Sequence, residues 1–458
     1  MARDVSDTTP ITGRAELVEW FEAGCKPVSS HRIGTEHEKV PFYRANLGPV
    51  PYISPDGSGG IRHILLGLRD RLGWAPILDG EHIIGLADET GGGAISLEPG
   101  GQFELSGAPV TTIHETHAEL EHHFEALRPL MTELGIGFLS LGMSPKWTLN
   151  ETPRMPKSRY AIMERYMPKV GTRGLDMMFR TCTVQANYDF SSEADMVKKL
   201  RVSIALQPLA TALFANSPFT DGKLNGRLSE RSEIWRATDN DRAGMIPFVF
   251  EDGMGFERYV DYALGVPMYF VKRGEHYHDV AGADFRDLLA GRLAPLPGEH
   301  AVMSDWANHL STIFPEVRLK RFLEMRGADA GPLPLLAALP ALFAGLLYSP
   351  AALDAAWDLV KGWSDAQREQ LRADVPVQGL RAVVAGRGLR DIGREVLALA
   401  RAGLAERNHR DAQGRDETIY LDVLDTILAG QTEAERLIAL FNGPWDGSVD
   451  PAFRECIY

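Results

Sequence analysis

Apolar and polar residues alternate along several short segments of the chain, which is typical of β-strands with one buried face. In the clearest of these, residues 181–189, threonine, glutamine, asparagine and aspartate occupy one face, and cysteine, valine, alanine and tyrosine occupy the other. A strand of this kind fits an antiparallel sheet that has its core on one side and a cleft on the other. The same reasoning predicts strands over residues 31–43, 82–86, 95–98, 101–106, 137–143 and 317–326.

Apolar residues with helical spacing predict helices between these strands. They cover residues 14–24, a stretch ending at residue 72, 111–134 and 191–215, the last with Ser191 or Ser192 as its N-cap. Residues 216–244 are rich in Gly, Asn, Arg and Asp and are expected to form a long functional loop. Since strands dispersed through the first two thirds must meet in one sheet, we expect a single α+β domain over 1–458. Its catalytic sheet lies within about 30–330, and its part 331–458 is helical and supplies packing.

Acidic side chains recur on one face of the predicted strands. Because side chains two residues apart point the same way, Glu36 projects beside Glu38, and Gln102 beside Glu104. Glu324 projects beside Arg326 in the same manner. With Glu98, these carboxylates are hard oxygen ligands suited to two or three Mg²⁺ ions. The alternative is a set of solvated strand faces, where Glu is common, but the basic residues interleaved on 317–326 favour a binding cleft.

Basic residues form a second candidate group. Arginine binds carboxylates and phosphates through two parallel hydrogen bonds, so arginines beside an acidic metal site favour anion binding. Taken one at a time, the same residues could equally be partners in surface ion pairs. The group consists of Arg159, Arg231, Arg236, Arg318, Lys320 and Arg326.

Composition and missing motifs narrow the function. The 458 residues carry a net charge of −14 and show no basic stripe, so nucleic-acid binding is not expected. No GxxxxGK[ST], GxGxxG, HExxH or GxSxG motif occurs. His37 alternates away from the two neighbouring glutamates and is expected in the core or behind the ligands, whereas His114, His117, His122 and His123 are expected on a helix surface.

The expected location is the cytoplasm. The three cysteines are far apart in sequence and form no CxxC pair, which suits a reducing compartment. Residues 1–7 lack the layout of a signal peptide, and the apolar stretch 332–348 is interrupted by prolines, so no membrane span is expected.

Long, loop-rich motifs resemble the plant and proteobacterial type of glutamate–cysteine ligase over nearly the whole chain. They lie at residues 32–39, 96–107, 166–171, 175–178, 180–185, 215–219, 314–320 and 324–329. The resemblance implies a glutamine-synthetase-like core, in which a curved, mostly antiparallel sheet carries helices on its outer face and the active site on its concave face. It also implies ATP-dependent joining of the L-glutamate γ-carboxylate to the amine of L-cysteine through a γ-glutamyl phosphate, the first step of glutathione synthesis.

Site residues follow from the matched motifs. Glu36, Glu38, Glu98, Glu104 and Glu324 resemble the metal ligands, with Gln102 as a possible helper. Arg159, Arg231 and Arg326 resemble catalytic residues, the first two also as binders of glutamate, and Lys320 and Arg326 resemble ATP contacts. Tyr269, Gln185 and Thr183 are the remaining predicted substrate contacts.

Three questions stay open at this level. The amine acceptor could differ from cysteine in a related ligase, the chain could be an inactive binding protein of the same fold, and it could be a monomer or a homodimer. The partners expected are the small molecules glutamate, cysteine and ATP, with no nucleic acid and no membrane. Plant members of the family carry regulatory cysteine pairs, and the aligned positions here hold His117, Ala337, Val280 and Pro295. That redox switch is therefore expected to be absent.

Overall fold

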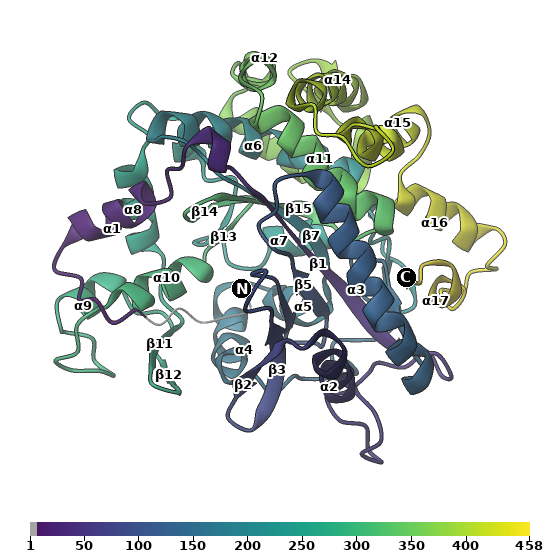
Figure 1. The fold of residues 1–458 in the computed structure, drawn as a ribbon, viewed down its shortest axis with the longest axis horizontal. Coiled ribbons are helices and arrows are strands. Elements are labelled where there is room, and N and C mark those ends of the chain that lie inside the picture. The colour runs from purple at the N-terminus through teal and green to yellow at the C-terminus, as the bar shows by residue number, and fades with distance from the viewer. Residues whose placement is uncertain (1–6) are drawn as a thin grey trace.

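A nine-stranded sheet forms the centre of the computed structural model, which describes residues 7–458 (Figure 1). Eight strands follow the order β14-β15-β7-β1-β5-β4-β3-β2, and β6 pairs with the second half of β1. Every neighbouring pair in this sheet is antiparallel. The strands are β1 (Ile33–Tyr43), β2 (Ala75–Asp79), β3 (His82–Ala87), β4 (Ala94–Leu97), β5 (Phe103–Ser106), β6 (Ile136–Leu139), β7 (Thr183–Tyr188), β14 (Val317–Leu319) and β15 (Leu323–Asp329).

Long helices cover the outer face of this sheet. Figure 1 shows α6 (Glu193–Leu213) and α11 (Leu333–Leu347) above the strands and α3 (Ile113–Leu134) along them. The hydroxyl of Tyr188 on β7 donates to the carbonyl of Pro340 on α11 at 2.9 Å, which joins strand to helix within the core. A second layer lies beyond them, made of α12 (Pro350–Val360), α13 (Asp365–Gln378), α14 (Leu389–Arg407) and α15 (Asp422–Ala429). The remaining helices pack on strands: α2 (Ile61–Leu72) on β3, α16 (Glu433–Asn442) beside Phe219, and α17 (Ala452–Glu455) on β1 through Phe42.

Shorter elements lie toward the other face and the edge of the sheet, except β16 (Val383–Val384) and β17 (Arg387–Gly388), which pack against α13 and α14. The helices are α1 (Arg14–Glu22), α4 (Ser158–Val170), α5 (Gly174–Arg180), α7 (Glu230–Arg236), α8 (Phe256–Gly265), α9 (Phe285–Leu289) and α10 (Met303–Ser311). Two-stranded pairs are β8 (Phe219–Thr220) with β9 (Lys223–Leu224), β10 (Ala243–Gly244) with β13 (Phe314–Pro315), β11 (Phe270–Arg273) with β12 (His276–Asp279), and β16 with β17.

Local chemistry explains where the main helices begin. Ser192 caps α6 by accepting a hydrogen bond from the backbone N–H of Asp195 at 3.2 Å, as predicted. Thr112 and Glu115 form a capping box at the start of α3. The predicted strands and helices around these caps are confirmed to within a few residues, and the α+β class is confirmed with them.

Three expectations are wrong. Residues 317–326 are not one strand but a tight hairpin, β14 and β15, in which Arg318 is paired directly with Glu324. Residues 216–244 are not an irregular loop, because they contain β8, β9, α7 and β10. His123 is buried rather than exposed, and it packs beside His37, whose predicted place in the core is confirmed.

Within residues 7–458 no single helix is long and apolar enough to cross a membrane. The pair α11 and α12 reaches the required length and composition only together, with a 93° bend between them. Residues 1–6, on which the expectation about a signal peptide partly rests, lie outside the described residues. The extent of a single domain over 1–458 stays a prediction.

Candidate active site

Carboxylates from neighbouring strands meet on the face of the sheet opposite the long helices. Strand register places Glu38 of β1 directly beside Glu104 of β5, and Glu36 beside Gln185 of β7. Ser96 and Ser106 both donate hydrogen bonds to the Glu104 carboxylate, the second at 2.8 Å. Alternation along β1 thus gives the shared acidic face that the sequence predicts.

Glu98 joins this group through a glycine turn between β4 and β5. Gly101 has φ +88°, and a Cβ on Gly100 would lie 2.0 Å from the carbonyl oxygen of Phe179, so both positions require glycine. The hydroxyl of Tyr160 on α4 lies 3.4 Å from the Glu98 carboxylate. Glu98 therefore faces the same space as the strand carboxylates.

This space is a cavity of about 110 Å³ with acidic and basic walls. Its lining includes Glu36, Glu38, Glu98, Glu104, Arg159, Gln185, Arg318 and Arg326. Four of the five predicted metal carboxylates and two of the three predicted catalytic arginines therefore line one cavity. A second cavity of about 90 Å³ shares Glu38, Glu98, Gln185 and Arg326 with it and adds Thr183 and Arg231.

Repulsion among these neighbouring carboxylates disfavours their ionised forms. Burial and the neighbouring carboxylates of Glu98 and Glu104 raise the pKa of Glu38 well above its ordinary value. Burial and Glu104 likewise raise the pKa of Glu98. Within residues 7–458, however, no three His, Cys, Asp or Glu side chains are grouped closely enough to hold a metal ion by themselves.

Glu324 has a different environment from the other four carboxylates. It is fully buried and accepts hydrogen bonds from Arg318 at 2.5 and 3.0 Å, from Lys320 at 3.2 Å and from Arg326 at 3.1 Å. Burial alone would raise the pKa of Glu324, but these three cations hold it well below its usual range. Its charge is thus already balanced by the hairpin that carries it.

Arg231 is held in place by a buried aspartate. Asp329, at the end of β15, accepts hydrogen bonds from the hydroxyls of Ser217 at 2.7 Å and Ser229 at 2.9 Å. Ser229 caps α7, and Ser217 accepts from the backbone N–H of Arg231 at 3.2 Å. The Arg231 guanidinium then donates to the carbonyl of Arg326 at 2.9 Å, which fixes it beside the cavities.

The neutral polar residues differ in whether their side chains can still bind a ligand. Gln185 accepts a hydrogen bond from Arg326 at 2.5 Å and lines both cavities, so it can still orient a ligand. Thr183 donates to the carbonyl of Ala328 at 2.7 Å, and its backbone N–H donates to Glu38. Gln102 donates to two backbone carbonyls and accepts from Gly100, so its amide serves the turn.

Lys320 lies at the boundary with a larger cavity of about 440 Å³. That cavity is lined partly by Glu36, Trp20 and Phe322, with the glycine turn 92–93 and Lys320. Because Glu36 lines both this cavity and the acidic one, a ligand with a charged end and a flat end could extend from one to the other.

Tyr269 is not where a substrate contact is expected. It is 1% exposed in an aromatic and methionine cluster, its hydroxyl faces the sulfur of Met167, and Arg242 stacks 3.8 Å from its ring. Its neighbour Phe270 lines the cavity instead. Arg236 also lies outside the cavities and pairs with Glu233 at 2.8 Å. We therefore assign neither residue a substrate contact.

Sequence reasoning missed three contributors to the site. Asp329 is buried and is the last residue of the motif 324–329, and its place in that motif was the available signal. Trp235 lies four residues after Arg231, so the helix 230–236 places both side chains on one face, and both line the cavity of about 90 Å³. Arg372, on α13 in the C-terminal helical part, reaches the same region and gave no signal in the local sequence pattern.

The architecture first defines a class. An antiparallel sheet with an acidic and arginine-lined face is the glutamine-synthetase-like fold of carboxylate–amine ligases. A solved structure of a glutamate–cysteine ligase from Francisella tularensis in complex with AMP has the same fold. It matches 90% of this chain and 85% of that chain with a TM-score of 0.55 at 14% identity.

Sequence comparison then specifies the family. The model of "Glutamate-cysteine ligase family 2" matches residues 32–455, and the chain belongs to this family. The chloroplastic glutamate–cysteine ligase of Nicotiana tabacum is 52% identical over 450 residues, which cover 98% of this chain and 83% of that protein. The chloroplastic enzyme of Arabidopsis thaliana is 52% identical over 452 residues, covering 98% and 84%. The predicted activity, ATP-dependent glutamate–cysteine ligation as the first step of glutathione synthesis, is confirmed.

The predicted cytoplasmic location is wrong. The similar plant enzymes from tobacco, rice and Arabidopsis are chloroplastic. Cysteine spacing and overall composition therefore did not identify the compartment of these relatives, because they describe redox compatibility rather than an address.

Proposed function

We propose that the acidic cavity holds the γ-carboxylate of L-glutamate against the terminal phosphate of ATP, so that this chain makes a γ-glutamyl phosphate and passes it to the amine of L-cysteine. The observation that carries the proposal is the meeting of Glu36, Glu38, Glu98 and Glu104 with arginines around one cavity. The family membership supports the reaction, and this cavity supports its place.

Mg²⁺ fits the donors of this cavity. The four glutamates offer hard oxygen ligands, and the raised pKa values of Glu38 and Glu98 reflect a repulsion that a cation would relieve. Bound there, Mg²⁺ would neutralise phosphate oxygens during transfer. Since these carboxylates do not form a closed cage, two or three ions would share their remaining ligands with ATP and water. Glu324, with three cationic partners, instead holds the basic hairpin in shape.

ATP fits the boundary between the acidic cavity and the larger one. The phosphates would lie near Glu36, where Lys320 and Arg318 supply positive charge, and the nucleoside would extend toward Trp20 and Phe322. Arg326, fixed by Gln185 and Glu324, points a guanidinium at the same region. Such placement supplies the positioning and charge neutralisation on which phosphoryl transfer depends.

The proposed reaction has two steps. Arg159 and Arg231 hold glutamate, and a γ-carboxylate oxygen forms a bond to the terminal phosphorus of ATP while the bond to ADP breaks. The cysteine amine then attacks the carbonyl carbon of the acyl phosphate, phosphate leaves with the electrons of the C–O bond, and the amine loses a proton to form the amide. Arg326 and Arg231 would stabilise the charge on the departing phosphate.

Phosphate release from Mg-ATP tests this proposal. With wild-type protein and glutamate, we expect cysteine to raise release far more than alanine, serine or α-aminobutyrate at equal concentration. If cysteine gives no more turnover than these amines, the acceptor is wrong. If glutamate and cysteine give no turnover at all, the proposed function is wrong.

A matched pair of variants tests the cavity. Glu104→Gln keeps the size of the side chain and one acceptor oxygen but removes a site charge, and we expect turnover to fall by about 100-fold or more. Glu417→Gln removes an equally buried carboxylate, which pairs with Arg407 at 3.0 Å, outside the cavities. This control should keep wild-type turnover. Near-normal activity of folded Glu104→Gln would contradict the metal assignment.

A further inference from the structure

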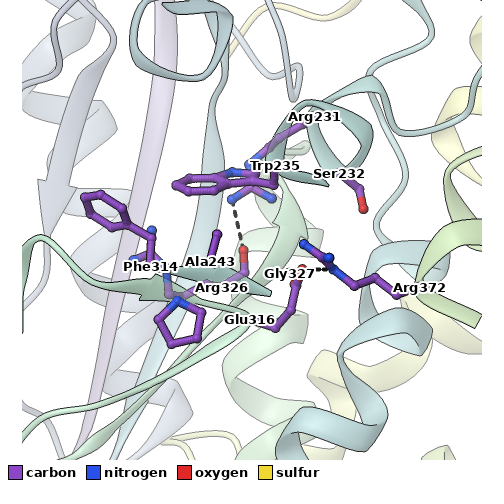
Figure 2. A pocket seen from close by; sticks show the side chains of 10 residues that line it. Arg231, Ser232, Trp235, Ala243, Phe314, Glu316, Arg326, Gly327 and Arg372 are labelled. Atoms are coloured by element: carbon purple, nitrogen blue, oxygen red, sulfur yellow. Dashed lines mark hydrogen bonds and ion pairs between the residues drawn. The ribbon is translucent and has the colours of Figure 1, made fainter. Parts of the chain in front are cut away.

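A very small cavity lies where the C-terminal helix α13 meets the active-site elements (Figure 2). It has a volume of about 10 Å³. Its walls come from α7 through Arg231 and Trp235, from β15 through Arg326, and from α13 through Arg372. Figure 2 shows the Arg372 guanidinium extending from its helix toward these side chains and meeting Glu316 on the way.

Arg372 has hydrogen-bonding capacity left over in a buried place. The residue is 7% exposed, and its Nε donates to Glu316 at 2.7 Å. Its Nη2 is buried without a hydrogen-bond partner among residues 7–458. The indole Nε1 of Trp235, in the same wall, is also buried and unpaired within the described part of the chain. Two unpaired buried donors in one wall are costly and indicate a ligand that accepts hydrogen bonds.

Charge and size restrict that ligand. The walls contain the guanidinium groups of Arg231, Arg326 and Arg372 and the carboxylate of Glu316. Arg326 is also paired with Glu324 at 3.1 Å, and Arg372 lies 3.9 Å from Glu369. Among the described residues, the Arg231 guanidinium is the charge of these walls that has no carboxylate within ion-pair distance, and it favours an anion over a neutral molecule. A volume of about 10 Å³ corresponds to one water-sized particle, so a whole phosphate or sulfate does not fit. A single anionic atom, such as a carboxylate oxygen or a halide ion, does fit.

The small cavity adjoins the catalytic one. Arg231, Trp235 and Arg326 also line the cavity of about 90 Å³ that contains Glu38 and Gln185. An amino acid bound there could therefore place one oxygen of its α-carboxylate between Trp235 and Arg372. A halide ion from solvent could occupy the same position.

We propose that Arg372 Nη2 and Trp235 Nε1, with Arg231 beside them, form a binding site for a single anionic atom, supplied by the α-carboxylate of an amino-acid substrate or by a halide ion. The helical C-terminal part thereby contributes a ligand-binding residue rather than packing alone. The substrate source rests on the function proposed above, and the halide source does not.

The competing explanation is that Arg372 serves only its ion pair with Glu316. Two variants separate these roles. Arg372→Met removes both the ion pair and the donor, whereas Glu316→Gln removes the ion pair and leaves the donor with less competing negative charge. An anion site predicts opposite effects of the two, and a structural ion pair predicts the same effect. Arg368→Met, one turn earlier on α13, removes another buried arginine that lies against Phe250 and outside the cavity lining.

Thermal unfolding tests the halide source. Wild-type protein without substrates is titrated with sodium bromide against sodium methanesulfonate at constant ionic strength, because a tetrahedral sulfonate, like sulfate, is too large for the cavity. If a halide binds, the midpoint rises saturably in wild type and Arg368→Met, rises at lower bromide in Glu316→Gln, and stays constant in Arg372→Met.

Steady-state kinetics in sodium methanesulfonate tests the carboxylate source. If a substrate carboxylate binds, Arg372→Met raises the KM of glutamate or cysteine by about 10- to 100-fold, the range for a hydrogen bond to a charged group, with a smaller change in kcat. Glu316→Gln should not raise that KM. Trp235→Phe, which keeps the ring and removes the other donor, should act in the same direction as Arg372→Met and covers the case in which that variant fails to fold.

The proposal is overturned if neither titration nor KM responds to Arg372→Met and Trp235→Phe, or if Glu316→Gln or Arg368→Met reproduces their effects. Wild-type turnover with glutamate and cysteine, measured in the same series, keeps this result separate from a failure of the proposed function.

Discussion

Two groups of carboxylates on the same sheet face have opposite electrostatic environments. Glu38 and Glu98 lie beside other carboxylates, and their pKa values are raised by burial and repulsion. Glu324 is at least as deeply buried, yet three basic side chains hold its pKa well below the usual range. Burial of a carboxylate is therefore not sufficient to identify a metal site. Carboxylates whose charge the chain leaves unbalanced are the ones that a bound cation can stabilise.

The largest expected effect is on stability when the balanced carboxylate is removed. Glu324→Gln leaves Arg318, Lys320 and Arg326 crowded together, and we expect the free energy of unfolding to fall by about 3–5 kcal/mol. Glu38→Gln removes repulsion, so we expect it to leave the metal-free protein equally stable or more stable. Urea denaturation without Mg²⁺ measures both changes.

The order of these two variants decides the comparison. If Glu38→Gln destabilises the metal-free protein as much as Glu324→Gln does, the two groups are not electrostatically different. The site arrangement would then need another explanation.

Glu119 is a single carboxylate whose pKa is raised by burial, and its replacement should change stability less than the replacement of Glu324. It accepts a hydrogen bond from the Ala108 backbone at 2.7 Å, and burial raises its pKa to about 7. A raised carboxyl pKa means that stability is fully present below the unfolded value of about 4.3 and is lost as pH rises to about 7. Glu119→Gln should therefore stabilise the protein by about 2 kcal/mol at alkaline pH and much less near the unfolded value, less than the full shift because the side chain is partly exposed.

Unfolding of wild type and Glu119→Gln in urea across this pH range checks the slope. Equal pH dependence of the two proteins would show that Glu119 does not titrate in this window.

The smallest effect is expected from oxidation. Cys182, directly before β7, and Cys456 are buried in one apolar cluster, and Cys25 is half-buried. Burial raises the pKa of the Cys182 thiol well above its ordinary value and so keeps it unreactive. We expect mild thiol oxidants to leave activity at saturating substrates unchanged. A reversible several-fold loss would contradict this, and Cys25→Ser would then identify the thiol.

Period-two patterns were sufficient to predict the strands that carry the acidic wall. Glu36 and Glu38 lie on one face of β1, and His37 lies on the other, as alternation requires. Alternation along residues 317–326 could not reveal the hairpin of β14 and β15, because it places Arg318 and Glu324 on the same face whether the segment is one strand or two. Only the turn at residues 320–322 brings the basic residues onto Glu324 and balances it.

Contacts between distant segments were out of reach of local pattern. Arg372 lies 56 residues from Glu316, its ion-pair partner, and a helical spacing in α13 says nothing about which pocket one arginine enters. Tyr269 shows the converse, because a sequence motif identified a residue that tertiary packing places in the core.

Magnesium-dependent stability is the most direct test of the central claim, that Glu38, Glu98 and Glu104 together bind a cation and that the chain leaves the charges of Glu38 and Glu98 unbalanced. The free energy of unfolding of wild type, Glu38→Gln and Glu104→Gln is measured as Mg²⁺ is titrated without ATP, with Glu417→Gln as the control. We predict a saturable gain for wild type and the control, about 2.7 kcal/mol at 100 times the dissociation constant, and a much smaller gain for the two site variants. Equal gains for all four proteins, or none for wild type, would contradict the account.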